Sequence, residues 1–520
     1  MKKAQKYFHE EKQSEEKNLV NTRKRQNLRK KHFVRCLKIV GLFIICFGLY
    51  MLWFINAEPT IDTDYVSQLN QINRPENYKQ EENAWPHYKK AIELFVEPKA
   101  GDEHSLLLSH PQKEFPELEE AERKSVIEWI GQNQAAWQEF AEAGLKPYCY
   151  KEYTLHELDE DFSRKLDIPT LKIDLRHLKG IRNLAMLGQW RIKTEIETGN
   201  TEQALDDCFT LLNTGTQWYQ NKCFVETTIG YGLRNTGYEG ILRIISRNEL
   251  TASRLKAIQE RLTNIYVEME AAFDLEFDKI LFLDMVQHTF TKGGLGGGHL
   301  IPKYVSPLVQ SGSIVITLGE LETEPTAREK VLYLVMSLLH ARRNKTISKF
   351  EEIYEQEKEI QKMTPYEIKK SGDLIGIKHP DIFNYKIRFD SFIRESRYFL
   401  VGLSIPVPEV MSTVKYQNRT MHEAAITILA LKRYMLENGG YPENLEELLN
   451  KGYIKKLPID PYSDKPMVYQ NTGTDFKLYS VGENFVDNGG EPVFYNGSNK
   501  LQKWGNVTDK GGDAVFWPAR

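Results

Sequence analysis

The chain has 520 residues and a formal net charge of −3, with 41% hydrophobic and 27% charged residues. This composition is ordinary for a globular protein, so it excludes a wholly disordered chain. The charge is unevenly divided: residues 1–38 hold 13 Lys and Arg against 4 Asp and Glu, a balance of +9, which leaves −12 for the remainder. An acidic main body argues against nucleic acid as the principal partner.

One uncharged segment has membrane-spanning length, which excludes a polytopic transporter. It runs from Ile39 to Ile55 (residues 39–55), and the stretch from Arg23 to Lys38 before it is rich in Lys and Arg and has no acid. At 1.5 Å per residue this helix spans about 25 Å, near the thickness of a bilayer core. The positive-inside rule predicts a basic cytoplasmic tail (residues 1–38) and a bulk outside the cytoplasmic membrane, in the periplasm.

A cleaved signal peptide is the alternative to an anchor. The basic region is long for a signal peptide, and Ile55-Asn56-Ala57 is a poor cleavage site because small residues are preferred there. We therefore predict an uncleaved signal anchor. The polar, proline-containing residues 56–80 are expected to form a linker.

Residues 81–416 show helical periodicity and predict an irregular α-helical domain. Two candidate helices, separated by Gly199-Asn200 with Thr201 as the expected N-cap, are similar to one tetratricopeptide-type hairpin. No second copy occurs at a fixed period, so a repeat array is not predicted. The candidate helices are residues 84–95, 117–143, 171–198, 202–219, 225–246, 251–287, 327–342, 346–363 and 382–401.

Catalytic signatures are absent from this sequence. His422-Glu423 lacks the second histidine of HExxH, no GxSxG occurs, and the stretch from Gly293 to Gly298 lacks the Lys and Ser/Thr of a P-loop. We interpret that stretch as a flexible surface loop, with a substrate-contacting lid as the alternative. The acidic and basic residues of 349–362 predict a solvated helix face with i,i+4 pairs.

The five cysteines include no CxxC pair, so neither a structural zinc site nor a thiol–disulfide enzyme is predicted. Cys149, Cys208 and Cys223 lie beyond the apolar segment, so at least one of these three is unpaired in a monomer. Cys208 and Cys223 are compatible with a disulfide in an oxidising compartment or with two buried thiols.

The last hundred residues carry the most specific pattern, which predicts a small α+β domain at residues 417–520. A helix ends at Asn438-Gly439-Gly440, since glycine tolerates the left-handed conformation of a C-cap. It is followed by a short helix at residues 444–451 and by strands at residues 467–470, 476–481 and 514–517. The helix is predicted from an apolar stripe of Met421, Ala424, Ala425, Ile428, Leu431 and Met435.

In this order the segment resembles the soluble domain of the major pseudopilin of type II secretion systems (protein G). The matching text is LKRYMLENGGYPENLEELL, GYIKKLPIDPYSDKPMVYQ, FKLYSVGENFVDNGG and GDAVFW, within residues 421–518. The whole chain also resembles membrane-anchored proteins of planctomycete-type bacteria. The expected fold class is therefore mainly α, with one transmembrane helix, an irregular helical body and a short antiparallel sheet at the C-terminus.

The resemblance implies a calcium ion in the loop after the second of these strands, held by backbone carbonyls and Asp side chains. Calcium takes six to eight oxygen ligands, which a glycine-rich loop can supply. Asn484 is neutral where the family carries a charge, so a weaker site is expected. Carried over by position, the ligands are Asn484, Asp487, Asp513, Ser480 and Val481.

These patterns favour a membrane-anchored scaffold or interaction protein of the cell envelope with an unidentified protein partner. One alternative is an extracytoplasmic enzyme of the hydrolase class, with its site in the helical body, although the missing signatures weigh against catalysis. Another is an accessory component of a secretion system. Pseudopilins carry Glu five residues after the processed glycine, whereas Gly41 is followed by Leu42 and no Glu, so polymerisation as a pilus subunit is not expected.

Overall fold

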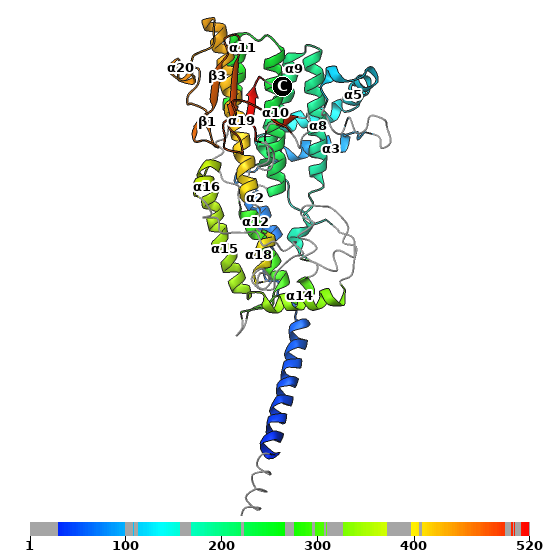
Figure 1. Cartoon of the computed structure of the whole chain (residues 1–520). Helices are drawn as coiled ribbons and strands as arrows, with labels where there is room; N and C mark the ends of the chain where they lie inside the picture. The colour runs from blue at the N-terminus through cyan, green and yellow to red at the C-terminus, as the bar shows by residue number, and fades with distance from the viewer. Residues whose placement is uncertain are drawn as a thin grey trace, which may run out of the picture. The chain divides into compact units, whose positions relative to one another are not determined.

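The computed structural model confirms the expected fold class: mainly helical, with an apolar N-terminal helix and small antiparallel sheets near the C-terminus (Figure 1). The chain divides into two compact units. Unit 1 is Met1–Thr60 with Thr289–Arg343, and unit 2 is Ile61–His288 with Asn344–Arg520. The structure describes residues 30–98, 108, 113–156, 168–219, 223–265, 275–293, 297–305, 308, 326–371, 397–404, 408–494, 501–502, 504 and 511–518.

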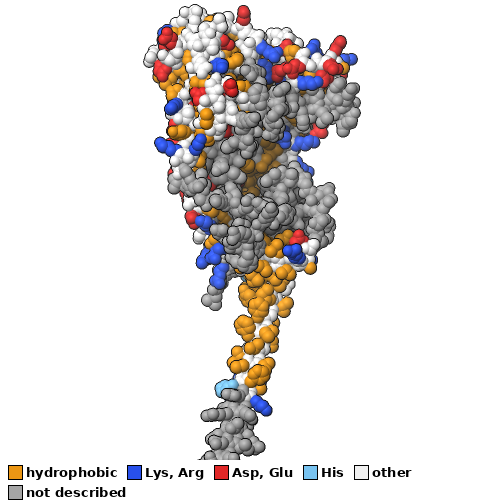
Figure 2. Space-filling view, in the orientation of Figure 1, with side chains coloured by type: hydrophobic (Ala, Val, Ile, Leu, Met, Phe, Trp, Pro, Cys, Tyr) orange, Lys and Arg blue, Asp and Glu red, His pale blue; other side chains and the backbone are white. Residues whose placement is uncertain are grey.

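Unit 1 contains the N-terminal helix Lys30–Ile55, whose 26 residues include the whole predicted apolar segment. Only 6% of its apolar window is buried, and Figure 2 shows hydrophobic side chains along this helix. Its last turn packs on His299, whose ring stacks on Phe54 at 4.2 Å. The unit also holds η4 (Pro302–Tyr304) and α14 (Ala327–Leu339).

Unit 2 has one extended hydrophobic core that runs from Ala84 to Trp517, so the helical body and the C-terminal strands are packed together. Its helices are α2 (Tyr65–Asn73), η1 (Gln80–Glu82), α3 (Trp85–Leu94), η2 (Phe115–Glu117), α5 (Glu120–Gln132), α6 (Gln134–Gly144), η3 (Pro169–Lys172), α8 (His177–Glu197), α9 (Thr201–Tyr219), α10 (Phe224–Arg247), α11 (Ala252–Ile265), α12 (Glu276–Thr289, whose last residue belongs to unit 1), α15 (Arg343–Ile360, whose first residue belongs to unit 1), α16 (Pro365–Ser371), α18 (Phe399–Ser404), α19 (Pro408–Asn438) and α20 (Leu445–Asn450).

The predicted hairpin is present as α8 and α9, joined through Gly199 at φ +80°. The expected cap was wrong by one residue. Thr201 is the first residue of α9 and its hydroxyl donates to Asn248, while the carbonyl of Asn200 accepts the amide of Ala204. A threonine beside a helix start can satisfy a tertiary partner instead of the helix end, and the sequence alone does not show that partner.

The stretch expected to be a linker is partly helical. Asp64 caps α2 by accepting the amide of Ser67, and Leu69 is buried against a small cluster that includes Tyr153 and Phe277. One buried leucine in a polar segment is a weak periodic signal, which explains why the helix was not predicted.

The helix expected at residues 117–143 is broken in two at Asn133. The buried amide side chain of this residue accepts the amide of Val96 at 2.8 Å and donates to the carbonyl of Trp129 at 3.0 Å. The helix expected at residues 251–287 corresponds to α11 and α12. Residues 266–274, and most of the helix expected at residues 382–401, lie outside the described residues.

The C-terminal strands are confirmed. β3 (Val468–Asn471), β4 (Phe476–Ser480) and β7 (Ala514–Trp517) form an antiparallel sheet in the order β3-β4-β7. Two further hairpins pair β1 (Ile459–Asp460) with β2 (Lys465–Pro466), and β5 (Val493–Phe494) with β6 (Leu501–Gln502). α19 continues without interruption through residue 417, where a domain boundary was expected.

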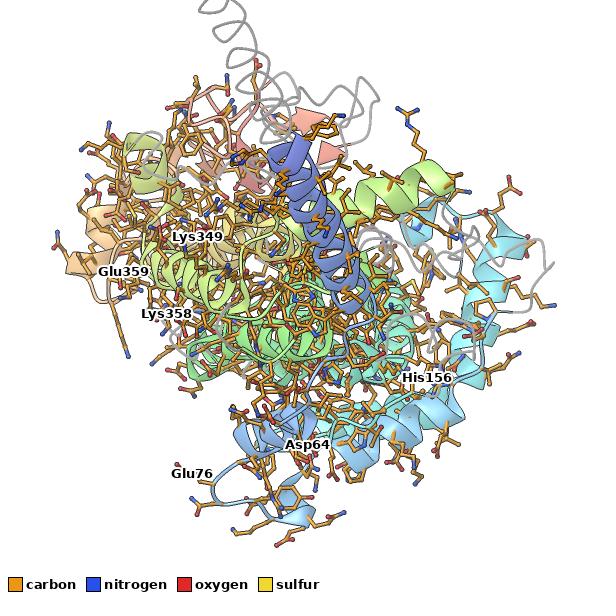
Figure 3. The ribbon with its side chains drawn as sticks, turned by 90° about the horizontal axis from the view of Figure 1, so that it is seen from below. Asp64, Glu76, His156, Lys349, Lys358 and Glu359 are labelled. Carbon is orange, nitrogen blue, oxygen red and sulfur yellow. The ribbon has the colours of Figure 1, made fainter. Side chains whose placement is uncertain are left out.

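The predicted solvated face lies on α15, where Lys349, Lys358 and Glu359 are labelled in Figure 3. Its ion pairs have i,i+3 spacing, such as Lys349 with Glu352 at 2.8 Å, rather than the expected i,i+4 spacing. Such exposed pairs add little stability.

Cys208 and Cys223 are both buried thiols that form no disulfide, so the disulfide alternative for this pair is wrong. Burial raises the pKa of both thiols well above the ordinary value, which leaves them protonated and unreactive.

Candidate functional site

The structure brings the predicted loop residues together at the end of β4. Asp513 precedes β7, and its carboxylate accepts the amides of Asn488 and Gly490, at 3.1 and 2.6 Å. The residue is fully buried, and burial raises the pKa of its carboxyl group. The two backbone amides act in the opposite direction, because they stabilise the charged form.

The other two predicted side-chain ligands also bond within the loop. The hydroxyl of Tyr479 donates to Asp487 at 3.0 Å, and the amide of Gly489 donates to the same oxygen at 2.9 Å. The carbonyl oxygen of Asn484 accepts the amide of Val486 at 3.0 Å. The bonds from the amides of Gly489 and Val486, each two residues after its acceptor, are Asx turns, a common use of Asp and Asn in tight loops.

A buried carboxylate that is not among the predicted ligands lies beside this loop. Asp460 is fully buried and accepts four hydrogen bonds. Its donors are the amides of Tyr462 and Val481, both at 3.1 Å, and the hydroxyls of Ser463 and Ser480, at 3.0 and 2.7 Å. Ser480 and Val481, expected to offer carbonyls to calcium, therefore donate to a carboxylate.

The arrangement does not fit a calcium ion. A calcium site directs six to eight oxygens at one point, whereas this loop directs N–H and O–H groups at its own carboxylates. Among the described residues, no group of three or more His, Cys, Asp or Glu is placed to hold a metal.

Removal of calcium is therefore expected to leave the melting temperature unchanged. A melt of the full chain with millimolar calcium should match one with a chelator. If the ion did bind, calcium at 100 times its dissociation constant would add about 2.7 kcal/mol to the stability. Asp513→Ala should lower the melting temperature equally in both conditions. A rise specific to calcium, lost in Asp513→Ala, would show that the loop rearranges to bind the ion.

A second buried acid lies in the helical body. Glu226 of α10 accepts the hydroxyl of Tyr153 at 2.6 Å and lies 3.6 Å from the ring of His177, the first residue of α8. Neither ring nitrogen of His177 has a hydrogen-bond partner among the described residues. The ring is packed between Trp85 and Trp218, at 5.2 and 5.4 Å. A substrate would have to displace one of these rings, so we assign the group a structural role.

A buried guanidinium joins α10 to α9 and α19. Arg234 is fully enclosed and donates to Asn418 at 2.9 Å, Thr216 at 2.6 Å and Tyr238 at 2.7 Å. These acceptors are neutral. The ring of His422 lies next to the group, with its Nδ1 3.0 Å from the hydroxyl of Tyr238.

His422 is expected to make the protein sensitive to acid. Burial, with Arg234 and Lys456 nearby, lowers its pKa from 6.5 to about 3. Below pH 6.5 the unfolded chain takes up the proton before the folded chain does, so stability is lost as the pH falls. The loss is about 1.4 kcal/mol per pH unit.

The measurement is a pair of melts at pH 7 and pH 5 for the native chain and for His422→Gln, in which the side chain cannot charge. The native chain should lose about 2 kcal/mol more than the variant over this interval. His340, whose pKa burial lowers to about 4, remains in both proteins and cancels in the difference. Equal losses would show that His422 does not titrate differently on unfolding.

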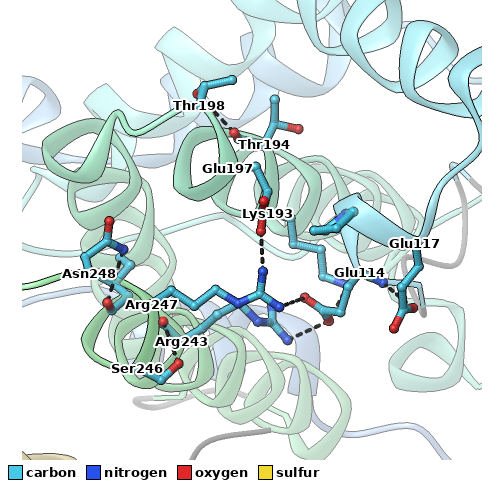
Figure 4. Close-up of polar contacts among 12 residues, drawn as sticks. Glu114, Glu117, Lys193, Thr194, Glu197, Thr198, Arg243, Ser246, Arg247 and Asn248 are labelled. Carbon is cyan, nitrogen blue, oxygen red and sulfur yellow. Dashed lines mark hydrogen bonds and ion pairs between the residues drawn. The ribbon is translucent and has the colours of Figure 1, made fainter.

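An ion cluster connects η2 to α8 and α10 (Figure 4). Glu114 lies 3.3 Å from the Nζ of Lys193 and 2.9 Å from Arg243, while Arg247 pairs with Glu197. Burial lowers the pKa of Lys193, and the nearby carboxylate of Glu114 acts in the opposite direction because it stabilises the charged form. The cluster fixes three segments that are far apart in sequence.

A surface cavity of about 210 Å³ opens between α3, α5 and α8. Its lining includes the rings of Phe95 and Trp129 and the ion pair between Lys179 and Glu97, at 2.8 Å. Pockets that enclose a small molecule usually have roughly 300–1,000 Å³. This cavity is below that range, so its size favours a surface contact over an enclosed substrate.

The fold thus defines an α-helical protein with an apolar N-terminal helix and a small α+β end. No protein-family model, curated protein or solved structure matches the chain.

Proposed function

We propose that this is a single-pass membrane protein of the cell envelope that acts as a scaffold or interaction protein. The basic tail lies in the cytoplasm, the helix Lys30–Ile55 is an uncleaved anchor, and the helical body and the C-terminal domain are periplasmic. The body binds a protein partner. The C-terminal domain, which resembles the pseudopilin soluble domain, is a docking unit of the same body.

The observation that carries the proposal is the exposure of the N-terminal helix. Its 26 residues extend about 39 Å, enough to cross a hydrocarbon core with some tilt. Side chains such as Phe43 and Leu49 are exposed although they are apolar. Lipid would cover such a surface, while the basic residues before it set the orientation.

Membrane extraction and protease accessibility test this proposal. The full chain should stay in the membrane pellet at alkaline pH, and protease added to spheroplasts should digest the body. Ile45→Arg should weaken insertion by about 3 kcal/mol, while Ile45→Leu serves as the matched control. Release of the native chain at alkaline pH, or an N-terminus at residue 58 in the mature protein, would contradict an anchor.

A further inference from the structure

Helix α14 of unit 1 has two faces of different character. Thr326 and Glu329 form a capping box that fixes its start. Met336 and Ser337 are buried, and the hydroxyl of Ser337 donates to the carbonyl of Leu300. Several apolar residues stay exposed along the helix, at 37–62% of their full area. They are Val331, Leu332, Val335 and Leu338.

The exposed apolar residues of α14 lie on one face of the helix. Val331, Val335 and Leu338 are spaced by four and three residues, which places them on the same side of a helix. Soluble proteins rarely leave a contiguous apolar face in water, because each side chain of this kind gains about 1.5–3 kcal/mol when fully buried. We therefore expect an apolar environment to cover this face in the working protein.

Unit 1 connects α14 to the C-terminal end of the anchor helix. Leu300, which accepts from Ser337, follows His299, and the ring of His299 lies against Phe54 and Trp53, at 4.2 and 4.9 Å. A second connection joins Lys303 to Glu58 at 2.7 Å. In Figure 1, α14 lies crosswise to the N-terminal helix, next to this end of it.

The aromatic residues at the same end mark the level of a membrane surface. Tyr50 and Trp53 are exposed and lie in the last two turns of the helix. Tyr and Trp are enriched where hydrocarbon meets headgroups. Because α14 is connected to Trp53 through His299, it lies at the depth of the interface. Because it is oriented crosswise to the membrane-spanning helix, it runs parallel to the membrane.

Charge at the two ends of α14 fits the same surface. Arg328 is exposed in its first turn, and Arg342 is exposed just beyond its end. Basic residues that flank an apolar helix face are attracted to phosphate headgroups, while the apolar residues enter the acyl boundary.

We propose that α14 is an interfacial helix, whose face of Val331, Leu332, Val335 and Leu338 lies in the outer surface of the bilayer that holds the anchor. The occupant of this face is phospholipid. The inference rests on the proposed anchor, since lipid reaches α14 only if the helix Lys30–Ile55 spans the membrane. With two attachments, unit 1 is held at a fixed height and tilt instead of turning freely about one helix.

Nitroxide labels on the full chain test this placement. The exposed Cys36 and Cys46 are first changed to Ser, which leaves the three buried thiols. Single labels are then introduced by Val335→Cys on the exposed face, Lys330→Cys as a same-helix control, and Phe43→Cys in the anchor. The proteins are reconstituted in vesicles of phosphatidylcholine and phosphatidylglycerol, and collision with oxygen is compared with collision with a water-soluble nickel complex.

We expect the labels at 335 and 43 to collide mainly with oxygen and the label at 330 mainly with nickel. A label at 335 as accessible to nickel as the one at 330, with 43 still in lipid, would overturn the interfacial helix and leave the anchor intact. A label at 335 shielded from both reagents would show that protein, such as a second copy, covers the face. A nickel-accessible label at 43 would overturn the anchor as well.

Discussion

Gly230→Ala is expected to lower the free energy of unfolding by about 3 kcal/mol, because a methyl group at this position would enter the contact between α9 and α10. The added carbon would lie 2.7 Å from the carbonyl oxygen of Gly215 and 2.8 Å from the amide nitrogen of Tyr219. Both are backbone atoms, so no rotation of a side chain can relieve the clash. The two helices would have to move apart, which would disturb the core on both sides.

The same contact continues along the helix pair. A methyl group at Gly237 would lie 2.8 Å from the carbonyl oxygen of Cys208, and one at Gly240 would lie 2.5 Å from the sulfur of Cys208. Missing side chains therefore let two antiparallel helices approach closely over several turns. Gly240→Ala should cost less than Gly230→Ala, because a sulfur can rotate away and a backbone carbonyl cannot.

Gly232→Ala is the matched control on the same helix. Nothing lies within 4 Å of the added carbon, so this change should stabilise α10 by about 0.5–1 kcal/mol through helix propensity. Thermal melts of the full chain in detergent, followed by circular dichroism, give the comparison. Equal melting temperatures for Gly230→Ala and Gly232→Ala would show that the two helices are not in close contact.

The close packing of α9 on α10 could not be predicted from the sequence of either helix. Apolar periodicity correctly predicted a helix over α10 in spite of its glycines, since periodicity depends on residues of one segment. The function of those glycines depends on α9, and nothing in the spacing of either helix identifies the other as its partner. In the same way, His177 and Glu226 are far apart in the chain and meet only in the folded body.

The residues around the end of β4 show a second limit of the sequence. Asp487 lies in the loop after β4 and Asp513 precedes β7, and the amide of Asn488 joins the two segments by donating to Asp513. The backbone angles of a loop decide whether its carbonyl groups or its amide groups point inward. Here Gly489 and Gly490 have φ of +73° and +78°, and their amides face carboxylates. Glycine allows these positive φ angles but does not require them, so the sequence does not show which backbone groups face inward. The positions of Asp487 and Asp513 in the sequence therefore do not determine which backbone groups face their carboxylates.

Asp460→Asn is expected to destabilise the C-terminal sheets by about 2–4 kcal/mol, since the native carboxylate accepts four hydrogen bonds and an amide accepts fewer. One of the two oxygens becomes an NH₂ group, which cannot accept from a backbone amide. If the amide nitrogen replaces Oδ2, the N–H of Val481 is buried without an acceptor. If it replaces Oδ1, the same happens to Tyr462. The hydroxyls of Ser463 and Ser480 can rotate, whereas these backbone donors cannot.

Asp464→Asn is the control, because it makes the same chemical change four residues away. Asp464 has φ +56°, a conformation that Asn also tolerates, and its only described side-chain bond is a weak one of 3.5 Å from Thr364. The melting temperature of Asp464→Asn should equal that of the native chain. Limited proteolysis should cut Asp460→Asn first near β1 and the end of β4, the two segments that Asp460 holds together. If both variants melt with the native chain, Asp460 is not what joins β1 to the end of β4.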